Sequence, residues 1–206
     1  MTAPANDYEP SAWDNIIAQN PNHSIWYRDR WRTMSANGED IFGEARLIDA
    51  MATRGCRILD AGCGSGRVGG YLAQHGHTIV GVDGDPVLIE AARQDYPQAT
   101  WITENLAALD LPAHEITDPF DLIVCAGNVM TFLAPSTRQR VLTRLAAHLT
   151  PAGRAVIGFG AGRGYEFDEF FQDAAQAGLT PSLNLASWDL QPYENGNFLV
   201  SVLRRY

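Results

Sequence analysis

One aspartate and three glycines at fixed spacing are the residues of this chain that point most directly to chemistry. Residues 58–69 run Ile-Leu-Asp-Ala-Gly-Cys-Gly-Ser-Gly-Arg-Val-Gly, so Asp60 precedes glycines at 62, 64 and 66. Glycine adopts backbone conformations that are closed to other residues and lets a ligand approach the main chain closely. A helix that starts after this loop would offer unpaired N–H groups at its first turn. The stretch therefore predicts a binding loop for a polar ligand.

The same stretch contains a pattern found in dinucleotide-binding loops. Residues 64–69 satisfy GxGxxG, which on its own is a weak indication. Asp60 disfavours a dinucleotide, because a carboxylate at the end of the first strand would face the pyrophosphate. It suits a ligand that carries an ammonium and a sulfonium. A nicotinamide-dependent oxidoreductase stays as the alternative enzyme.

The elements that must position this loop alternate between strand and helix from Cys56 onward. The apolar strand candidates are residues 56–61, 78–83, 99–103, 120–126 and 154–159. Helices are expected over about 86–94, 136–149 and 166–177. Asp85 before Pro86 predicts the start of the first of these helices, and Ser136 with Gln139 is a capping-box pattern for the second. This alternation predicts a parallel sheet that is covered on both faces.

The last thirty residues follow a different pattern. Apolar and polar residues alternate over 183–190 and again over 198–202, and Asn195-Gly196 stands between the two runs. Both residues tolerate the positive φ of a type I′ turn, so we expect an antiparallel hairpin with that turn. Residues 1–54 lie outside the alternating pattern and are expected to form an N-terminal helical cap. The predicted fold is α/β: a Rossmann-like doubly wound, mostly parallel seven-stranded sheet that ends in an antiparallel hairpin, with an N-terminal helical cap.

These motifs, in this order, resemble the class I (Rossmann-like) S-adenosylmethionine-dependent methyltransferase family, and the resemblance runs from about Cys56 to the C-terminus. Asp60 to Gly66 matches the first motif of the family, and Asp83, at the end of a strand, matches the second. Residues 120–128 (Phe-Asp-Leu-Ile-Val-Cys-Ala-Gly-Asn) are similar to its fourth-strand motif. The resemblance implies S-adenosylmethionine as the cofactor of a domain over 55–206. It also implies methyl transfer to a small-molecule acceptor by direct displacement.

The resemblance implies a set of cofactor-binding residues as well. The glycine loop would line the methionine part, Asp60 would lie near its amino group, and Asp83 would accept both ribose hydroxyls. Gly84 stands where many family members have a larger apolar side chain, so Leu88 or Leu106 would form the wall against the adenine. The residues expected at the cofactor are Asp60, Gly62, Cys63, Gly64, Gly66, Asp83, Gly84, Leu88, Glu104, Asn105, Leu106, Ala126, Asn128, Trp26 and Tyr27.

Position along the strands selects candidates for the acceptor site, because ligands of open parallel sheets bind outside the carboxyl ends of the strands. The rule assigns four histidines to the opposite end, as surface or turn residues: His75, His77, His114 and His148. It leaves His23 as a candidate general base if the cap folds over the site, with a structural histidine as the alternative. Asn128 follows the fourth strand. Arg163 is the single cation of a glycine-rich loop after the fifth, where it favours an acceptor with a carboxylate or phosphate, or else belongs to a flexible turn.

Composition and charge argue against several classes of binding partner. The formal net charge is −9, and no basic face of the kind that binds a nucleic acid backbone is present. Apolar runs are far shorter than a membrane span, and the first residues lack the basic and apolar regions of a signal peptide, so we expect a cytoplasmic protein. Three cysteines without CxxC spacing argue against a structural zinc site and against a disulfide framework. Binding motifs do not prove chemistry, so a non-catalytic S-adenosylmethionine-binding regulatory protein stays as a further alternative.

Overall fold

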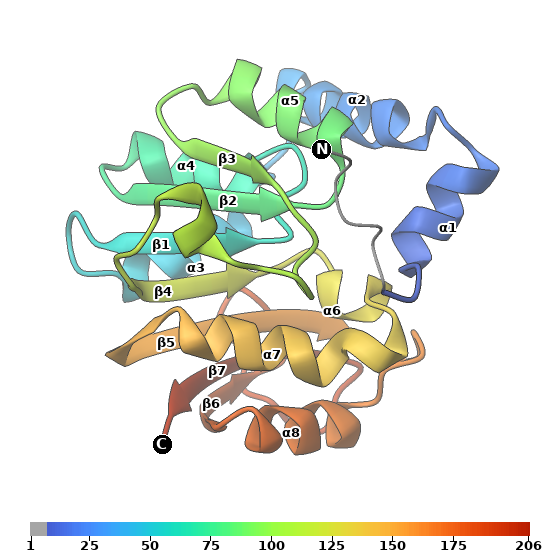
Figure 1. Ribbon diagram of the computed structural model, residues 1–206. Helices are drawn as coiled ribbons and strands as arrows, with labels where there is room; N and C mark the ends of the chain where they lie inside the picture. Colours follow the sequence, from blue (N-terminus) through green and yellow to red (C-terminus); the bar gives the residue numbers. More distant parts are fainter. Residues whose placement is uncertain (1–7) are drawn as a thin grey trace.

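Seven strands form one sheet in the computed structural model, which describes residues 8–206 (Figure 1). Their order is β3-β2-β1-β4-β5-β7-β6. The strands are β1 Arg57–Ala61, β2 Thr78–Asp83, β3 Thr100–Thr103, β4 Phe120–Cys125, β5 Leu149–Gly160, β6 Leu179–Leu185 and β7 Phe198–Arg205. The first five run parallel, whereas β7 is antiparallel to both β5 and β6. The predicted fold class is therefore confirmed.

Helices cover both faces of the sheet (Figure 1). Besides the cap helices α1 and α2, the helices are α3 Gly43–Met51, α4 Arg67–Gln74, α5 Pro86–Asp95, η1 Leu111–His114, α6 Val129–Phe132, η2 Pro135–Thr137, α7 Arg138–Ala147 and α8 Phe167–Gln176. Successive strand residues point to opposite faces, so Ile58 packs on the side of α3, α4 and α5 while Leu59 packs on the side of α7 and α8. Each face of the sheet thus has its own buried apolar layer.

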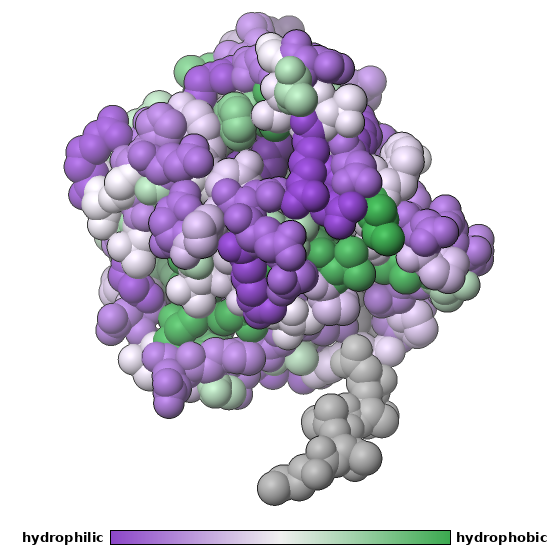
Figure 2. Space-filling view, turned by 90° about the horizontal axis from the view of Figure 1, so that it is seen from above, coloured by the Kyte–Doolittle hydropathy of each residue, from purple (hydrophilic) through white to green (hydrophobic). Residues whose placement is uncertain are grey.

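The N-terminal cap consists of α1 Ala12–Gln19 and α2 His23–Ala36. Helix α2 packs against α5 and α1 reaches α6, so the two helices extend across the edge where β1 to β5 end (Figure 1). Seen from above, the outer face around α2 and α5 is mostly hydrophilic, with small separate apolar areas (Figure 2). Helix α3 belongs to the sheet layer, because Ala45, Leu47 and Ile48 are buried in it. No helix within residues 8–206 combines the length and the apolar character that a membrane crossing requires.

Two predicted helix starts have different outcomes. Helix α5 begins at Pro86, and the Asp85 carboxylate accepts hydrogen bonds from the N–H groups of Val87 and Leu88, as predicted. The capping box at Ser136 is wrong. Ser136 lies in a short 3₁₀ turn, and its hydroxyl donates a hydrogen bond to Glu9. Helix α7 starts after Thr137 and has no side-chain cap.

The terminal strands pair antiparallel, but the predicted tight turn between them is wrong. Asn195 has φ +59° whereas Gly196 is not in the positive-φ region, and residues 186–197 all lie between the two strands. The cause is Trp188, whose ring packs where a side chain of Gly158 would be: a Cβ there would lie 2.3 Å from the indole. Residues 186–190 therefore leave the strand and fold over the end of β5.

Candidate active site

The glycine loop joins β1 to α4 at the place where the strand order reverses. Gly62, Gly64 and Gly66 have φ values of +76°, +55° and +80°, a region that side chains with a Cβ rarely adopt. The N–H groups of Gly62 and Cys63 donate to the carbonyl of Val82, at 2.8 and 3.1 Å, which fixes the loop against β2. The loop thus lies outside the carboxyl ends of β1 and β2, where open sheets of this kind bind ligands.

Asp60 lies beneath the loop and is only 2% exposed. Its Oδ2 accepts a hydrogen bond of 2.8 Å from the N–H of Gly69, in the first turn of α4. Burial raises the pKa of the carboxyl to about 7, and the Gly69 hydrogen bond opposes this rise only in part. Ionising the Asp60 carboxyl therefore costs free energy in the folded protein.

Asp83, at the end of β2, is less enclosed. Its two oxygens accept from the backbone N–H groups of Gly64 and Asp85, each at 2.9 Å. Desolvation still raises its pKa, to about 6. The neighbouring Gly84 is exposed, and a Cβ there would meet no atom within 4 Å. Asp83 thus stands beside open space, and each carboxylate oxygen keeps a further lone pair for a ligand.

Asp85 connects this site to the cap. While its Oδ1 caps α5, its Oδ2 accepts from the indole Nε1 of Trp13, at 3.0 Å, and from the hydroxyl of Ser24. Trp13 lies in α1 and Ser24 in α2, and both Asp85 and Ser24 are buried. One carboxylate therefore holds both cap helices at the start of α5, two residues from Asp83.

Aromatic side chains of the cap form a roof beside the glycine loop. The ring of Tyr27 lies 3.6 Å from the position of a Cβ on Gly64. Trp13 contacts Tyr27, His23 and Phe132 edge-on, with ring centroids 5.1–5.7 Å apart. Trp26 lies at a tilt to His23, with ring centroids 5.1 Å apart, and is 55% exposed. Of the two aromatic residues predicted at the cofactor, Tyr27 faces the loop, and Trp26 faces outward.

Other residues predicted at the cofactor have mixed surroundings. Leu88 and Leu106 are buried, and Ala126 follows β4 in the apolar layer on the α3 side. The Asn105 side chain accepts from the N–H of Ala107, and Glu104 approaches the N–H of Asp110 and His114 Nε2, at 3.4 and 3.3 Å. These polar groups thus already have partners within the protein.

The thiol of Cys63 points into the core and not toward the loop surface. Its sulfur would lie 3.1 Å from a Cβ on Gly81, in the middle of β2. Burial raises the pKa of Cys63 well above the usual thiol value, and it also raises those of Cys56 and Cys125. All three cysteines are free and buried. Only the main chain of Cys63 remains for contact with a ligand.

Asn128 and Arg163 meet at the end of β5. Asn128 has φ +63°, and its Oδ1 accepts from the N–H of Gly160, at 2.9 Å. Arg163 is exposed, and its Nε lies 3.6 Å from the position of a Cβ on Gly160. Within residues 8–206, Arg163 makes no ion pair, and the Asn128 side chain bonds through its oxygen while its amide nitrogen makes no hydrogen bond. The two predicted acceptor residues therefore converge on one glycine.

The histidines are arranged differently from the prediction in one respect. His23 lies in the aromatic roof, half-buried between Trp13 and Trp26. His77 is buried and not a surface residue: its Nε2 lies 2.9 Å from Asp49 and its Nδ1 3.6 Å from the sulfur of Cys56. Its position at the amino end of β2 explains the contact, because the C-terminal half of α3 packs there.

Arg67 is the cation nearest to the loop, and it is neutralised. Its guanidinium makes two hydrogen bonds of 2.8 Å to Glu44, at the start of α3, and one to the carbonyl of Ile41. Its flat face stacks on Trp31, 4.3 Å from the ring centroid. Arg67 is therefore already paired and is not free to balance a charge on Asp60 or Asp83.

The residues that sequence analysis missed act through long-range contacts. Trp13 and Ser24 are 72 and 61 residues away from Asp85 along the chain. Neither has a motif that predicts such a partner. The sequence around Asp85 predicts only the role of this residue as a helix cap.

Comparison with known proteins identifies relatives along most of the chain. A family model described as "Methyltransferase domain" matches residues 58–153. The crystal structure of a TehB-like S-adenosylmethionine-dependent methyltransferase from Corynebacterium glutamicum is 50% identical. It superposes with a TM-score of 0.86 over 91% of this chain and 100% of that one.

Two curated relatives match a smaller part. An uncharacterised methyltransferase from Synechocystis sp. is 34% identical over 60% of this chain and 56% of its own length. The magnesium-protoporphyrin O-methyltransferase of Rhodobacter capsulatus is 35% identical over 49% of this chain and 43% of its own length. The chain thus spans about half the length of the curated relatives it matches.

Proposed function

This chain belongs to the class I S-adenosylmethionine-dependent methyltransferase family, and on that premise we propose that it methylates a small-molecule acceptor with S-adenosylmethionine. The observation that carries the proposal is the combination of the D-x-G-x-G-x-G loop with Asp83 at the end of β2. The relatives compared above are methyltransferases and lend no support to the oxidoreductase alternative or to a regulatory protein without turnover.

The charge around the loop fits this cofactor better than a dinucleotide. Asp60 and Asp83 are two carboxyls with raised pKa values, and the nearby Arg67 is already paired with Glu44. A ligand with an ammonium and a sulfonium would lower the cost of ionising these carboxyls, whereas a pyrophosphate would raise it. The open space at Gly84 beside Asp83 supports a nucleoside part at that position.

We infer the following roles for the chain's own residues. The main chain at Gly62, Gly64 and Gly66 would bind the amino-acid part, and Asp83 would accept hydrogen bonds from the ribose. When bound, S-adenosylmethionine supplies an electrophilic methyl group on a sulfonium that is already a good leaving group. The protein's contribution is therefore mainly alignment of the acceptor, which can be worth on the order of 7–11 kcal/mol.

The acceptor is proposed to bind between the cap and the ends of β4 and β5. Arg163 would orient an anionic group, and the free amide N–H of Asn128 would donate to the acceptor, because the amide oxygen already holds Gly160. The cap with Tyr27 would exclude water from the aligned reactants. His23 stays a candidate general base for an acceptor that must lose a proton.

Calorimetry tests the cofactor assignment. S-adenosylmethionine and S-adenosylhomocysteine are expected to bind at micromolar concentrations and to raise the melting temperature, whereas NAD and NADP are not. Incubation with methyl-labelled S-adenosylmethionine and a panel of small acceptors then tests turnover. Binding of NADP with no response to S-adenosylhomocysteine would refute the proposal.

A further inference from the structure

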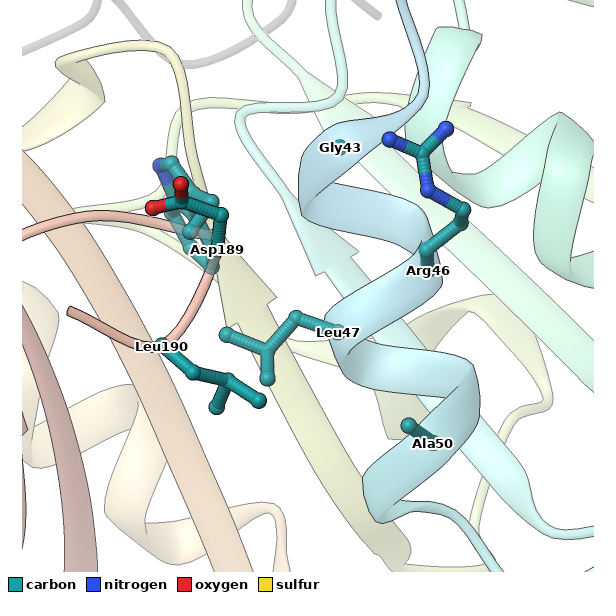
Figure 3. A pocket seen from close by; sticks show the side chains of 7 residues that line it. Gly43, Arg46, Leu47, Ala50, Asp189 and Leu190 are labelled. Atoms are coloured by element: carbon teal, nitrogen blue, oxygen red, sulfur yellow. The ribbon is translucent and has the colours of Figure 1, made fainter.

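A groove lies between α3 and the loop that follows β6 (Figure 3). It has a volume of about 450 Å³ and lies between Gly43, Arg46, Leu47 and Ala50 of α3 and Trp188, Asp189 and Leu190 of the loop. The side chains of Leu47 and Leu190 point toward each other across it (Figure 3). The interior of the groove is therefore apolar.

Leu190 has an unusual conformation for an exposed leucine. It is 60% exposed and has φ +71°, a region that is disfavoured for residues with a Cβ. The surrounding turn is fixed by a hydrogen bond of 2.8 Å from the N–H of Ala186 to the carbonyl of Gln191 and by a bridge between Leu185 and Pro192. Strained residues concentrate at ligand sites, and here the strain presents an apolar side chain to a groove.

One wall of the groove, Trp188, packs on the same face of β5 as Arg163. Trp188 covers Gly158 and Arg163 covers Gly160, and because side chains of a strand alternate, these two glycines face the same side. They are two residues apart, which corresponds to about 7 Å along the strand. Ala126, after β4, belongs to the same apolar layer as Leu47. The wall of the apolar groove and the Arg163 cation therefore lie on the same face of β5, near its carboxyl end.

The other charges at the groove do not oppose this arrangement. Arg46 is paired with Asp40 through two hydrogen bonds of 2.6 Å. The Asp189 carboxylate accepts from the hydroxyl of Ser187 and points away from Leu47 and Leu190 (Figure 3). Among residues 8–206, Arg163 and Arg154 make no ion pair, and Arg154 donates to the carbonyl of Met51 at the end of α3, so Arg163 is the exposed cation left for an anionic group.

We propose that the acceptor is an amphiphile whose anionic group binds at Arg163 and Asn128 and whose apolar chain or ring occupies the groove between α3 and Leu190. This inference rests on the proposed function and adds the chemical class of the acceptor. A carboxylate or phosphate suits the arginine, and the flat face of Trp188 with the two leucines suits hydrocarbon.

Binding of simple probes tests the inference. Protein saturated with S-adenosylhomocysteine is titrated with n-alkyl carboxylates from butanoate to decanoate and with alkanols of the same lengths. Affinity of the carboxylates should rise by up to about fourfold per added methylene until the groove is full. Absence of any dependence on chain length would overturn the proposal.

Three variants separate the contributions. Leu190→Asn should flatten the dependence on chain length while the fold is kept, because asparagine adopts positive φ readily. Leu183→Asn is the matched control, since Leu183 is an exposed leucine of β6 outside the groove, and it should leave the dependence unchanged. Arg163→Gln should weaken all carboxylates by about tenfold without changing the alkanols. A Leu190→Asn protein that behaves like Leu183→Asn would place the hydrocarbon elsewhere.

The outcome is distinguishable from failure of the proposed function. Binding of S-adenosylhomocysteine is measured on the same samples before the probes are added. If it does not bind, the methyltransferase proposal fails, whatever the probes do. If it binds and neither the chain length nor Arg163 affects the probes, the amphiphilic acceptor alone is refuted.

Discussion

Asp60 and Asp83 lie at the carboxyl ends of the neighbouring strands β1 and β2, but their surroundings give them different roles. Asp60 is enclosed and holds the N–H of Gly69, which fixes the start of α4. Asp83 accepts from two backbone groups and borders the open space at Gly84. The first carboxyl therefore mainly positions the loop, and the second is the better candidate for direct contact with a ligand.

Removal of the Asp83 carboxylate should weaken cofactor binding. Asp83→Ala is expected to reduce the affinity for S-adenosylhomocysteine by about 1.5–3 kcal/mol, the range for hydrogen bonds to a charged group, as measured by calorimetry. Glu104→Gln is the control, because Glu104 already approaches Asp110 and His114, and it should change the affinity by less than about threefold. A larger effect of Glu104→Gln than of Asp83→Ala would show that Glu104 holds the ribose.

The Asp60 carboxyl should make stability depend on pH. Its folded pKa of about 7 lies above the unfolded value of about 3.9, so its contribution is fully present below pH 4 and is lost as the pH rises through 7. Asp60→Asn avoids the buried charge. The free energy of unfolding of the variant relative to the natural protein should therefore rise by up to about 1.4 kcal/mol per pH unit between about pH 4 and 7.

Urea denaturation of the ligand-free proteins at several pH values measures this difference. Glu115→Gln, at an exposed turn residue, serves as the matched control for the loss of a surface carboxyl. If the difference in free energy of unfolding between Asp60→Asn and the natural protein does not change with pH, the Asp60 carboxyl does not titrate in this window.

At the scale of the elements, the junction between the cap and α5 is the feature with the clearest consequence. Asp85 holds α1 through Trp13 and α2 through Ser24, and its own N–H donates to Asp83. The residue that docks the cap, Asp85, thus lies in the same turn as Asp83 of the cofactor site. We expect the cap to open when this junction is weakened.

Ser24→Ala should loosen the cap without removing the N-cap of α5, because Asp85 Oδ1 still accepts from Val87 and Leu88. Amide hydrogen exchange in α1 and α2 should become about tenfold faster or more, and S-adenosylhomocysteine should dissociate faster. Ser35→Ala, at an exposed position of the same helix, should change neither rate. Equal exchange in the two variants would show that Ser24 does not hold the cap.

The elements also show how far local sequence patterns reach. The strand before the glycine loop, the Asp85 cap and the antiparallel end of the sheet are all predictable, since each depends on residues close in sequence. The capping box at Ser136 and the tight turn at Asn195-Gly196 fail because distant partners intervene: Glu9 binds Ser136, and Gly158 receives Trp188. Competition from tertiary contacts is not visible in a local pattern.

The same limit applies to the candidate site as a whole. Carboxyl ends of parallel strands share one edge, so Asp60, Asp83 and Asn128 could be assigned to it from sequence. The position of the cap over that edge, and the placement of Arg163 and Trp188 on one face of β5, depend on contacts between segments far apart in the chain. These relations required the structure.

At the scale of the whole molecule, residues 8–54 contain a separable part, the cap helices α1 and α2, and an inseparable part, α3. Helices α1 and α2 contact the rest mainly through α5 and α6, whereas α3 contributes three buried residues to the sheet layer and Glu44 to Arg67. We therefore expect the protein to fold when it is truncated up to about Gly38, and not to fold when it is truncated up to about Arg54.

A protein without residues 1–38 should unfold cooperatively, bind the cofactor more weakly and lose methyl transfer. A protein without residues 1–54 should not fold, because it would expose the apolar layer around Ile58. Circular dichroism melts and transfer assays compare the two. Normal transfer by the shorter deletion would show that the cap is not part of the site.

The burial of all three thiols has a practical consequence for observing the cap. Thiolates are the reactive species toward maleimides, and burial keeps Cys56, Cys63 and Cys125 protonated and inaccessible. A cysteine introduced at Gln19, on the exposed end of α1, would therefore be the single labelling position without any deletion of natural residues. A dye at that position would report cap motion in real time in an otherwise unmodified protein.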